Sequence, residues 1–70
     1  MHKFSPALIE AMRNALDEVM TRVPLEYSTP AIKAYFAECI LRAAAQGQTS
    51  YDELIAAAAD QLQIALSTFT

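Results

Sequence analysis

The stretch that decides the fold is Pro30–Gln46, PAIKAYFAECILRAAAQ. Apolar residues recur along it at spacings of three and four, which predicts a helix buried along one face. These residues are Ile32, Tyr35, Phe36, Cys39, Ile40 and Ala43. The opposite face carries a second stripe, Ala34, Ala37, Leu41 and Ala45. A helix that is apolar on two opposite sides needs cover on both, so this pattern concerns packing and assembly rather than chemistry.

Helix start signals appear at three places in the chain. Ser5-Pro6 and Thr29-Pro30 each combine a hydroxyl at the N-cap with a proline in the first turn, where its missing N–H is not needed. Ser50–Glu53 is a capping box, in which the hydroxyl and the carboxylate satisfy each other's free backbone donors. We therefore expect three helices.

Helix stop signals set the other ends. Pro24 ends the first helix, because the residue before a proline is driven out of the helical conformation. Gly47, the only glycine, lies where a left-handed residue ends the middle helix. The predicted helices are residues 6–22, 30–46 and 51–68. The fold class is all-α, either a three-helix bundle or a helical hairpin with an additional N-terminal helix.

The flanking helices carry apolar stripes of their own. In the first, the stripe is Ile9, Met12, Leu16, Val19 and Val23, widened by Leu8, Ala15 and Met20. In the last, it is Leu54, Ile55, Ala58, Leu62, Ala65, Leu66 and Phe69, with Ile64 on the far side. Charged residues on the outside of the first helix are spaced for the surface pairs Glu10–Arg13, Arg13–Asp17 and Glu18–Arg22. Between the first two helices, Leu25 and Tyr27 are apolar enough to fold back onto the bundle.

Composition points to a small soluble domain. The 70 residues are 54% hydrophobic and carry a net charge of -3, which allows one domain, residues 1–70, and is too apolar for disorder. No apolar segment of a signal peptide follows Met1–Pro6. The longest purely apolar run, Leu54–Ala59, is far shorter than the ~20 residues that span a membrane. We expect a cytoplasmic protein that does not enter the membrane.

Residue types used in catalysis and metal binding are scarce. The only histidine, His2, lies in residues 1–4, which we expect to be frayed, so the usual general base is missing. Cys39 falls in the inner stripe of the middle helix, where a free cysteine is normally a buried, inert residue. With one Cys, one His and one Gly, the chain offers no zinc site, calcium loop or phosphate-binding loop. We predict a protein that is not an enzyme and needs no cofactor or metal.

The last two helices and the turn between them invite comparison with a helix-turn-helix motif. With Gly47 in the turn, the flanking positions that such a motif keeps apolar are Gln46 and Gln48. The last helix has three acidic residues and no Lys or Arg, whereas a recognition helix brings basic side chains to phosphates and bases. The sequence argues against nucleic-acid binding, but a small nucleic-acid-binding or transcription-associated helical protein is the alternative function.

The outer stripe of the middle helix is the candidate oligomer interface, formed by Ala34, Ala37, Leu41 and Ala45, with Ile64 as a further exposed candidate. A chain of this size has a marginal core, and its single cysteine allows no internal disulfide. If the last helix covers the stripe instead, no interface is needed. We expect a self-associating, non-catalytic protein–protein interaction module, a homodimer, with an unidentified protein as a further candidate partner.

The run Ala37–Gly47, followed by a capped helix, resembles small all-helical bacterial proteins of unknown function. The shared pattern is Ala-Glu-x-Ile-Leu-x-x-Ala-x-x-Gly, and the resemblance covers residues 29–60. It implies an all-α fold and a bacterial, cytosolic source. It implies no activity and no site residues.

Overall fold

The computed structural model describes residues 4–68, so the predictions for His2 and Phe69 lie outside the described residues. All regular secondary structure within residues 4–68 is helical, which confirms the predicted all-α class. The elements are α1 (Pro6–Thr21), the short 3-10 helix η1 (Leu25–Tyr27), α2 (Pro30–Ala45), α3 (Tyr51–Ala59) and α4 (Leu62–Thr68).

The three predicted helix starts are confirmed by their hydrogen bonds. The Ser5 hydroxyl accepts from the Leu8 N–H at 3.1 Å, and the Thr29 hydroxyl accepts from the Ile32 N–H at 3.3 Å. At α3 the capping box is complete. The Glu53 N–H donates to the Ser50 hydroxyl at 3.1 Å, and the Ser50 N–H donates to the Glu53 carboxylate at 3.3 Å. Each helix start is therefore fixed by residues next to it in the sequence.

Gly47 ends α2 as predicted. Its φ of 97° lies in the left-handed region that a residue with a Cβ rarely adopts. The Gln48 N–H donates to the Ala43 carbonyl at 3.0 Å, and the Gly47 N–H donates to the Ala44 carbonyl at 3.1 Å. This pair of bonds is the Schellman motif, and it satisfies carbonyls that the end of the helix leaves free.

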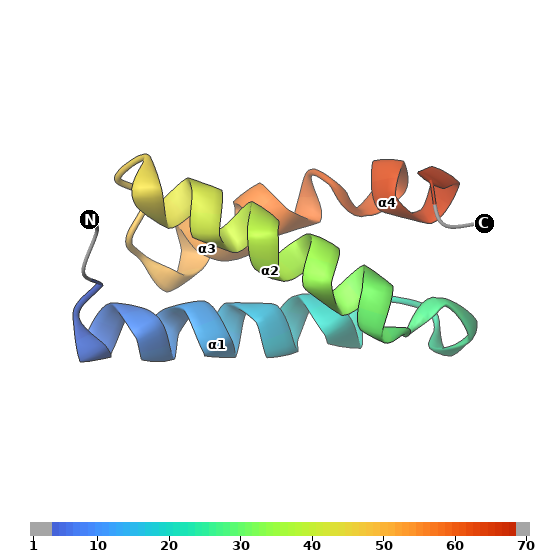
Figure 1. Ribbon diagram of the computed structural model, residues 1–70, viewed down its shortest axis with the longest axis horizontal. Helices are drawn as coiled ribbons and strands as arrows, with labels where there is room; N and C mark the ends of the chain where they lie inside the picture. Colours follow the sequence, from blue (N-terminus) through green and yellow to red (C-terminus); the bar gives the residue numbers. More distant parts are fainter. Residues whose placement is uncertain (1–3, 69–70) are drawn as a thin grey trace.

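The helices pack as a bundle rather than as a hairpin with a separate helix, because α1, α2 and α3 each contact the other two. In Figure 1, α1 runs along the lower edge, α2 runs obliquely from the lower right to the upper left in front of α3, and α4 lies at the upper right. The molecule measures 34 × 18 × 17 Å, with its long axis along the helices. A bundle only two helices wide has a narrow core.

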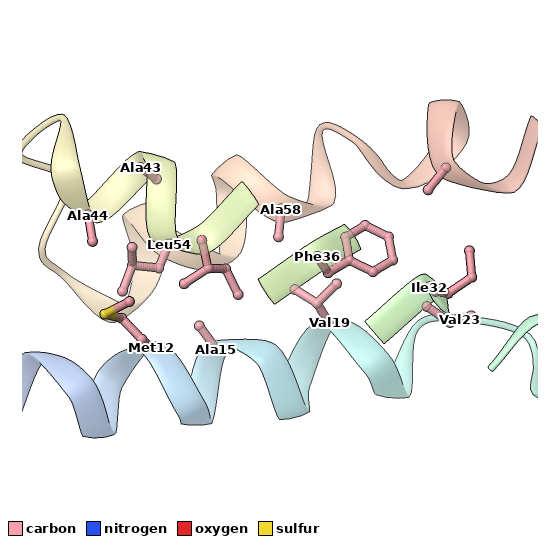
Figure 2. Packing of buried hydrophobic residues seen from close by; sticks show 12 residues of the cluster. Met12, Ala15, Val19, Val23, Ile32, Phe36, Ala43, Ala44, Leu54 and Ala58 are labelled. Atoms are coloured by element: carbon pink, nitrogen blue, oxygen red, sulfur yellow. The ribbon is translucent and has the colours of Figure 1, made fainter. Parts of the chain in front are cut away.

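Among residues 4–68, the core consists of twelve buried side chains, all of them apolar (Figure 2). Met12, Ala15 and Val19 point from α1 toward Leu54 and Ala58 of α3. The remaining members are Val23, Ile32, Phe36, Ile40, Ala43, Ala44 and Ala65. Five of the twelve are alanines, which let the helix backbones approach closely, and within residues 4–68 no polar side chain is buried. Phe36 is the largest fully buried residue, so much of the buried apolar area depends on a few large side chains.

The helix predicted over residues 51–68 is divided in the structure. Asp60 and Gln61 form a turn between α3 and α4, in which the Gln61 N–H donates to the Ala58 carbonyl at 3.0 Å. The Gln61 carbonyl then accepts from the Ala65 N–H at 2.8 Å and starts α4. The Tyr35 hydroxyl donates to the Gln61 side-chain oxygen at 3.2 Å, so α2 holds this turn from across the bundle.

Two smaller expectations also change, and part of a third is confirmed. Leu25 was expected to fold back onto the bundle, but it is 92% exposed, and only Tyr27 of that loop packs against the core. Phe4 belongs to the stretch expected to be frayed, but it is half-buried against the core. Of the predicted surface pairs, Glu18–Arg22 forms, with 3.6 Å between carboxylate and guanidinium.

Candidate interaction surface

The outer stripe of α2 stays largely uncovered within the described part of the chain. Ala34 and Ala45 are exposed, Ala37 is half-buried, and Leu41 is 47% exposed. Neither α3 nor α4 covers the stripe. The turn between them is bonded to Tyr35 on the other side of α2, and Ala34, Leu41 and Ala45 stay exposed. The alternative in which the last helix covers the stripe is therefore not what this fold shows.

A groove between α1 and α2 runs beside this stripe. Its volume is about 250 Å³, and seven of its eight lining residues are apolar. They are Phe4, Ile9, Met12, Leu16, Ala37, Ile40 and Leu41, with Arg13 as the polar member. Two of the predicted interface residues, Ala37 and Leu41, therefore line an apolar hollow as well as the outer face of α2. We call the stripe and this hollow together the α1–α2 groove surface.

Ile9 and Phe4 are members of this surface that the sequence pattern assigned differently. Ile9 continues the inner stripe of α1 by spacing, but it is 44% exposed. It lies in the second turn of α1, where the core stripe begins only at Met12. The position of Ile9 near the start of α1 is the sequence signal for its exposure, because the end turn of an amphipathic helix has fewer neighbours to cover it.

Ile64, the fifth predicted interface residue, lies apart from this surface. It is 54% exposed on α4, which follows the turn at Asp60–Gln61. The structure therefore brings Ala37 and Leu41 together with α1, keeps Ala34 and Ala45 on the same helix face, and places Ile64 on a different element.

A second, polar hollow of about 520 Å³ lies between α2 and α3. Its charged lining residues are Glu38, Arg42, Glu53 and Asp60. Arg42 is bound to Glu38 across one helical turn, with 2.9 Å between the guanidinium and the carboxylate. The hollow thus has an acidic balance and its one basic side chain already has a partner.

Cys39 lines this polar hollow, which corrects the expectation that it is buried. The side chain is half-buried, since α2 turns it toward the gap between α2 and α3 and not into the core. Partial burial raises the pKa of the Cys39 thiol above its ordinary value. The charge of Arg42 opposes the rise and the charge of Glu38 adds to it. The neutral thiol is therefore the favoured form, and this form is a weak nucleophile.

Neither a metal cluster nor a membrane-spanning helix adds to these two hollows in the part of the chain that the structure describes. Within residues 4–68, no three His, Cys, Asp or Glu side chains gather closely enough to hold a metal ion. Over the same residues, no helix has the length and hydropathy needed to cross a membrane. No protein family, curated protein or solved structure was found to match this chain.

Proposed function

We propose that this protein is a small, non-catalytic interaction module that self-associates as a homodimer through the α1–α2 groove surface. The observation that carries the proposal is an apolar groove whose lining includes two half-exposed large side chains, Ile9 and Leu41. Water contacts both side chains in the isolated chain, and a second molecule would remove that contact. Burying a large aliphatic side chain contributes about 1.5–3 kcal/mol.

The size of the chain supports the same proposal. Five of the twelve core residues are alanines, and a domain of this length has little apolar area to bury by itself. Small domains without disulfides or metals commonly gain stability from a partner subunit. We further propose that the protein acts in the cytoplasm of a bacterial cell, in line with the resemblance of residues 29–60.

Charge favours a protein partner over a nucleic acid. The polar hollow between α2 and α3 is lined by three carboxylates, and its one guanidinium is paired with Glu38. A phosphate backbone needs unpaired basic side chains, and its binding weakens steeply with salt. A gel shift at low salt tests the nucleic-acid alternative, and a complex that dissociates as salt is raised would favour it.

The mass of the protein in solution tests self-association. Light scattering at tens of micromolar is expected to give about twice the chain mass of 7.7 kDa. Leu41→Glu is expected to restore the monomer mass, because the charge would be buried without a partner in the dimer. Leu41 is half-exposed in the single chain, so the variant is expected to remain helical by circular dichroism. A wild-type mass of 7.7 kDa would contradict the proposal.

Two control variants locate the contact. Leu25→Glu changes a side chain that is 92% exposed at the η1 loop, outside the groove lining, and should leave the dimer intact. Ile64→Glu should also leave it intact, because Ile64 lies on α4. If Ile64→Glu dissociates the protein and Leu41→Glu does not, the contact lies on α4 and the surface named here is wrong.

A further inference from the structure

We propose that the two copies dock antiparallel, α2 against α2, with a two-fold axis level with Cys39 and Ile40. This inference rests on the proposed self-association and adds the geometry of the contact. In a two-fold interface each residue contacts a partner residue that returns the same contact. The surface on the outer stripe of α2 must therefore complement itself.

The stripe Ala34, Ala37, Leu41 and Ala45 complements itself when one copy is reversed. Its spacings are three, four and four, which read backward as four, four and three. Reversal about the proposed axis sets Ala34 against the partner's Ala45. It also brings Leu41 within about one residue of the level of the partner's Ala37. A large side chain thus meets a small one at both central positions, which lets each leucine enter the space that an alanine leaves.

The groove provides the room for that leucine. Ala37 lies in the lining of the 250 Å³ hollow, and Leu41 stands at its edge, 47% exposed. Because a two-fold axis between antiparallel helices keeps corresponding edges on the same side, the two grooves face one another. Ile9 and Leu41 of both copies then meet around one apolar centre, in an arrangement of four helices made from α1 and α2 of each chain.

The charged edge of α2 fits the same arrangement. Glu38 and Arg42 lie on the side of the stripe away from the groove, where they line the hollow next to α3. With the copies antiparallel, Glu38 comes within about one residue of the level of the partner's Arg42. The Glu38 carboxylate can then pair with the guanidinium of the partner's Arg42 as well as with the Arg42 guanidinium of its own chain, which is 2.9 Å away. The edge is therefore complementary in charge to its own reversed copy.

A parallel dimer lacks both kinds of complementarity. It sets Leu41 against the partner's Leu41 and Ala37 against the partner's Ala37, so large meets large and small meets small. It also turns the Glu38–Arg42 edge of each chain toward the groove of the other, where Arg13 is the one charged lining residue, so Arg42 would lose water beside a like charge. The antiparallel dimer is favoured on both grounds.

Disulfide trapping tests the orientation. Ala34→Cys and Ala45→Cys are made singly and together in a Cys39→Ser background, which removes the native thiol. The three substituted positions, 34, 39 and 45, are exposed or half-exposed. Circular dichroism and light scattering first check that the helicity and mass of each variant match the wild type. Two α-carbons must lie about 4.4–6.8 Å apart for a disulfide to close. Within one chain the two positions are about 16 Å apart along α2, so no internal disulfide can form.

The double variant is expected to convert almost completely to a covalent dimer under mild oxidation, and each single variant is expected to stay non-covalent. Self-linking of either single variant would overturn the antiparallel orientation, since identical positions meet only when the copies are parallel. A double variant that is dimeric by light scattering but does not cross-link would overturn the register and leave the proposed function standing. A monomeric wild type would reject the proposed function and this inference together.

Discussion

Cys39 shows how one residue responds to its place at the edge of a bundle. Its thiol is half-buried between α2 and α3, and this partial burial raises the pKa of Cys39 above its ordinary value of 9.0. A raised pKa in the folded state means that the folded protein holds the thiol proton more tightly than the unfolded chain does. The stability that this difference provides is present in full below about pH 9 and is lost as the pH rises through the folded pKa.

The rate of thiol labelling is expected to follow that pKa. Only the thiolate reacts, so alkylation of native protein should reach half its maximal rate at a higher pH than alkylation of protein unfolded in urea. Measuring both rates from pH 7 to pH 11 checks this. The unfolding free energy of wild type minus that of Cys39→Ser should also fall above pH 9. A native midpoint at or below the unfolded one would contradict the assigned cause.

Elements differ in how strongly local sequence determines them. The starts of α1, α2 and α3 and the end of α2 are predicted by their capping residues, because the hydrogen bonds that fix them join neighbours in the chain. The turn at Asp60–Gln61 has no such signal, since residues 51–68 contain neither glycine nor proline. It is held by the Tyr35 hydroxyl, 26 residues away, and a contact of that kind appears only once the chain has folded.

Proline substitutions test the division of this last helical stretch. Gln63 and Ala56 are both exposed, but Gln63 lies in the first turn of α4 and Ala56 lies inside α3. Proline is tolerated in a first turn and costs about 3 kcal/mol or more inside a helix. Gln63→Pro should therefore unfold near the wild-type urea midpoint, and Ala56→Pro should be strongly destabilised. Equal loss in both variants would indicate one continuous helix.

The interaction surface was only partly predictable for a similar reason. Ala34, Ala37, Leu41 and Ala45 follow from the helical period of one element. The groove beside them does not, because it depends on how α1 and α2 are set against each other and on Ile9 remaining half-exposed. Periodicity identifies which residues share a face, and it does not show where two helices diverge enough to leave a hollow.

At the scale of the whole molecule, a core rich in alanine makes the few large side chains decisive. Phe36 is fully buried, and Phe36→Ala should cost about 3–5 kcal/mol. A 70-residue domain has a total stability of about 4–10 kcal/mol at roughly 0.05–0.15 kcal/mol per residue. The variant should therefore be largely unfolded in dilute solution, or unfold at far lower urea concentration, as measured by circular dichroism.

Two further variants make this measurement specific. Phe36→Leu keeps most of the apolar volume and should remain folded. Leu25→Ala removes an exposed apolar side chain and should change stability by less than about 0.5 kcal/mol. If Phe36→Ala and Leu25→Ala shift the urea midpoint equally, the core is not organised around Phe36.

The segment between α1 and α2 has a consequence for handling the protein. Leu25 is 92% exposed there, and the caps at Ser5 and Thr29 bond to Leu8 and Ile32 and not to the η1 residues. Exposed loops of this kind are where proteases that prefer large apolar residues cut first, and where inserted sequence is best tolerated. The same loop is accordingly the place to insert an affinity tag, at the opposite end of α1 from Ile9.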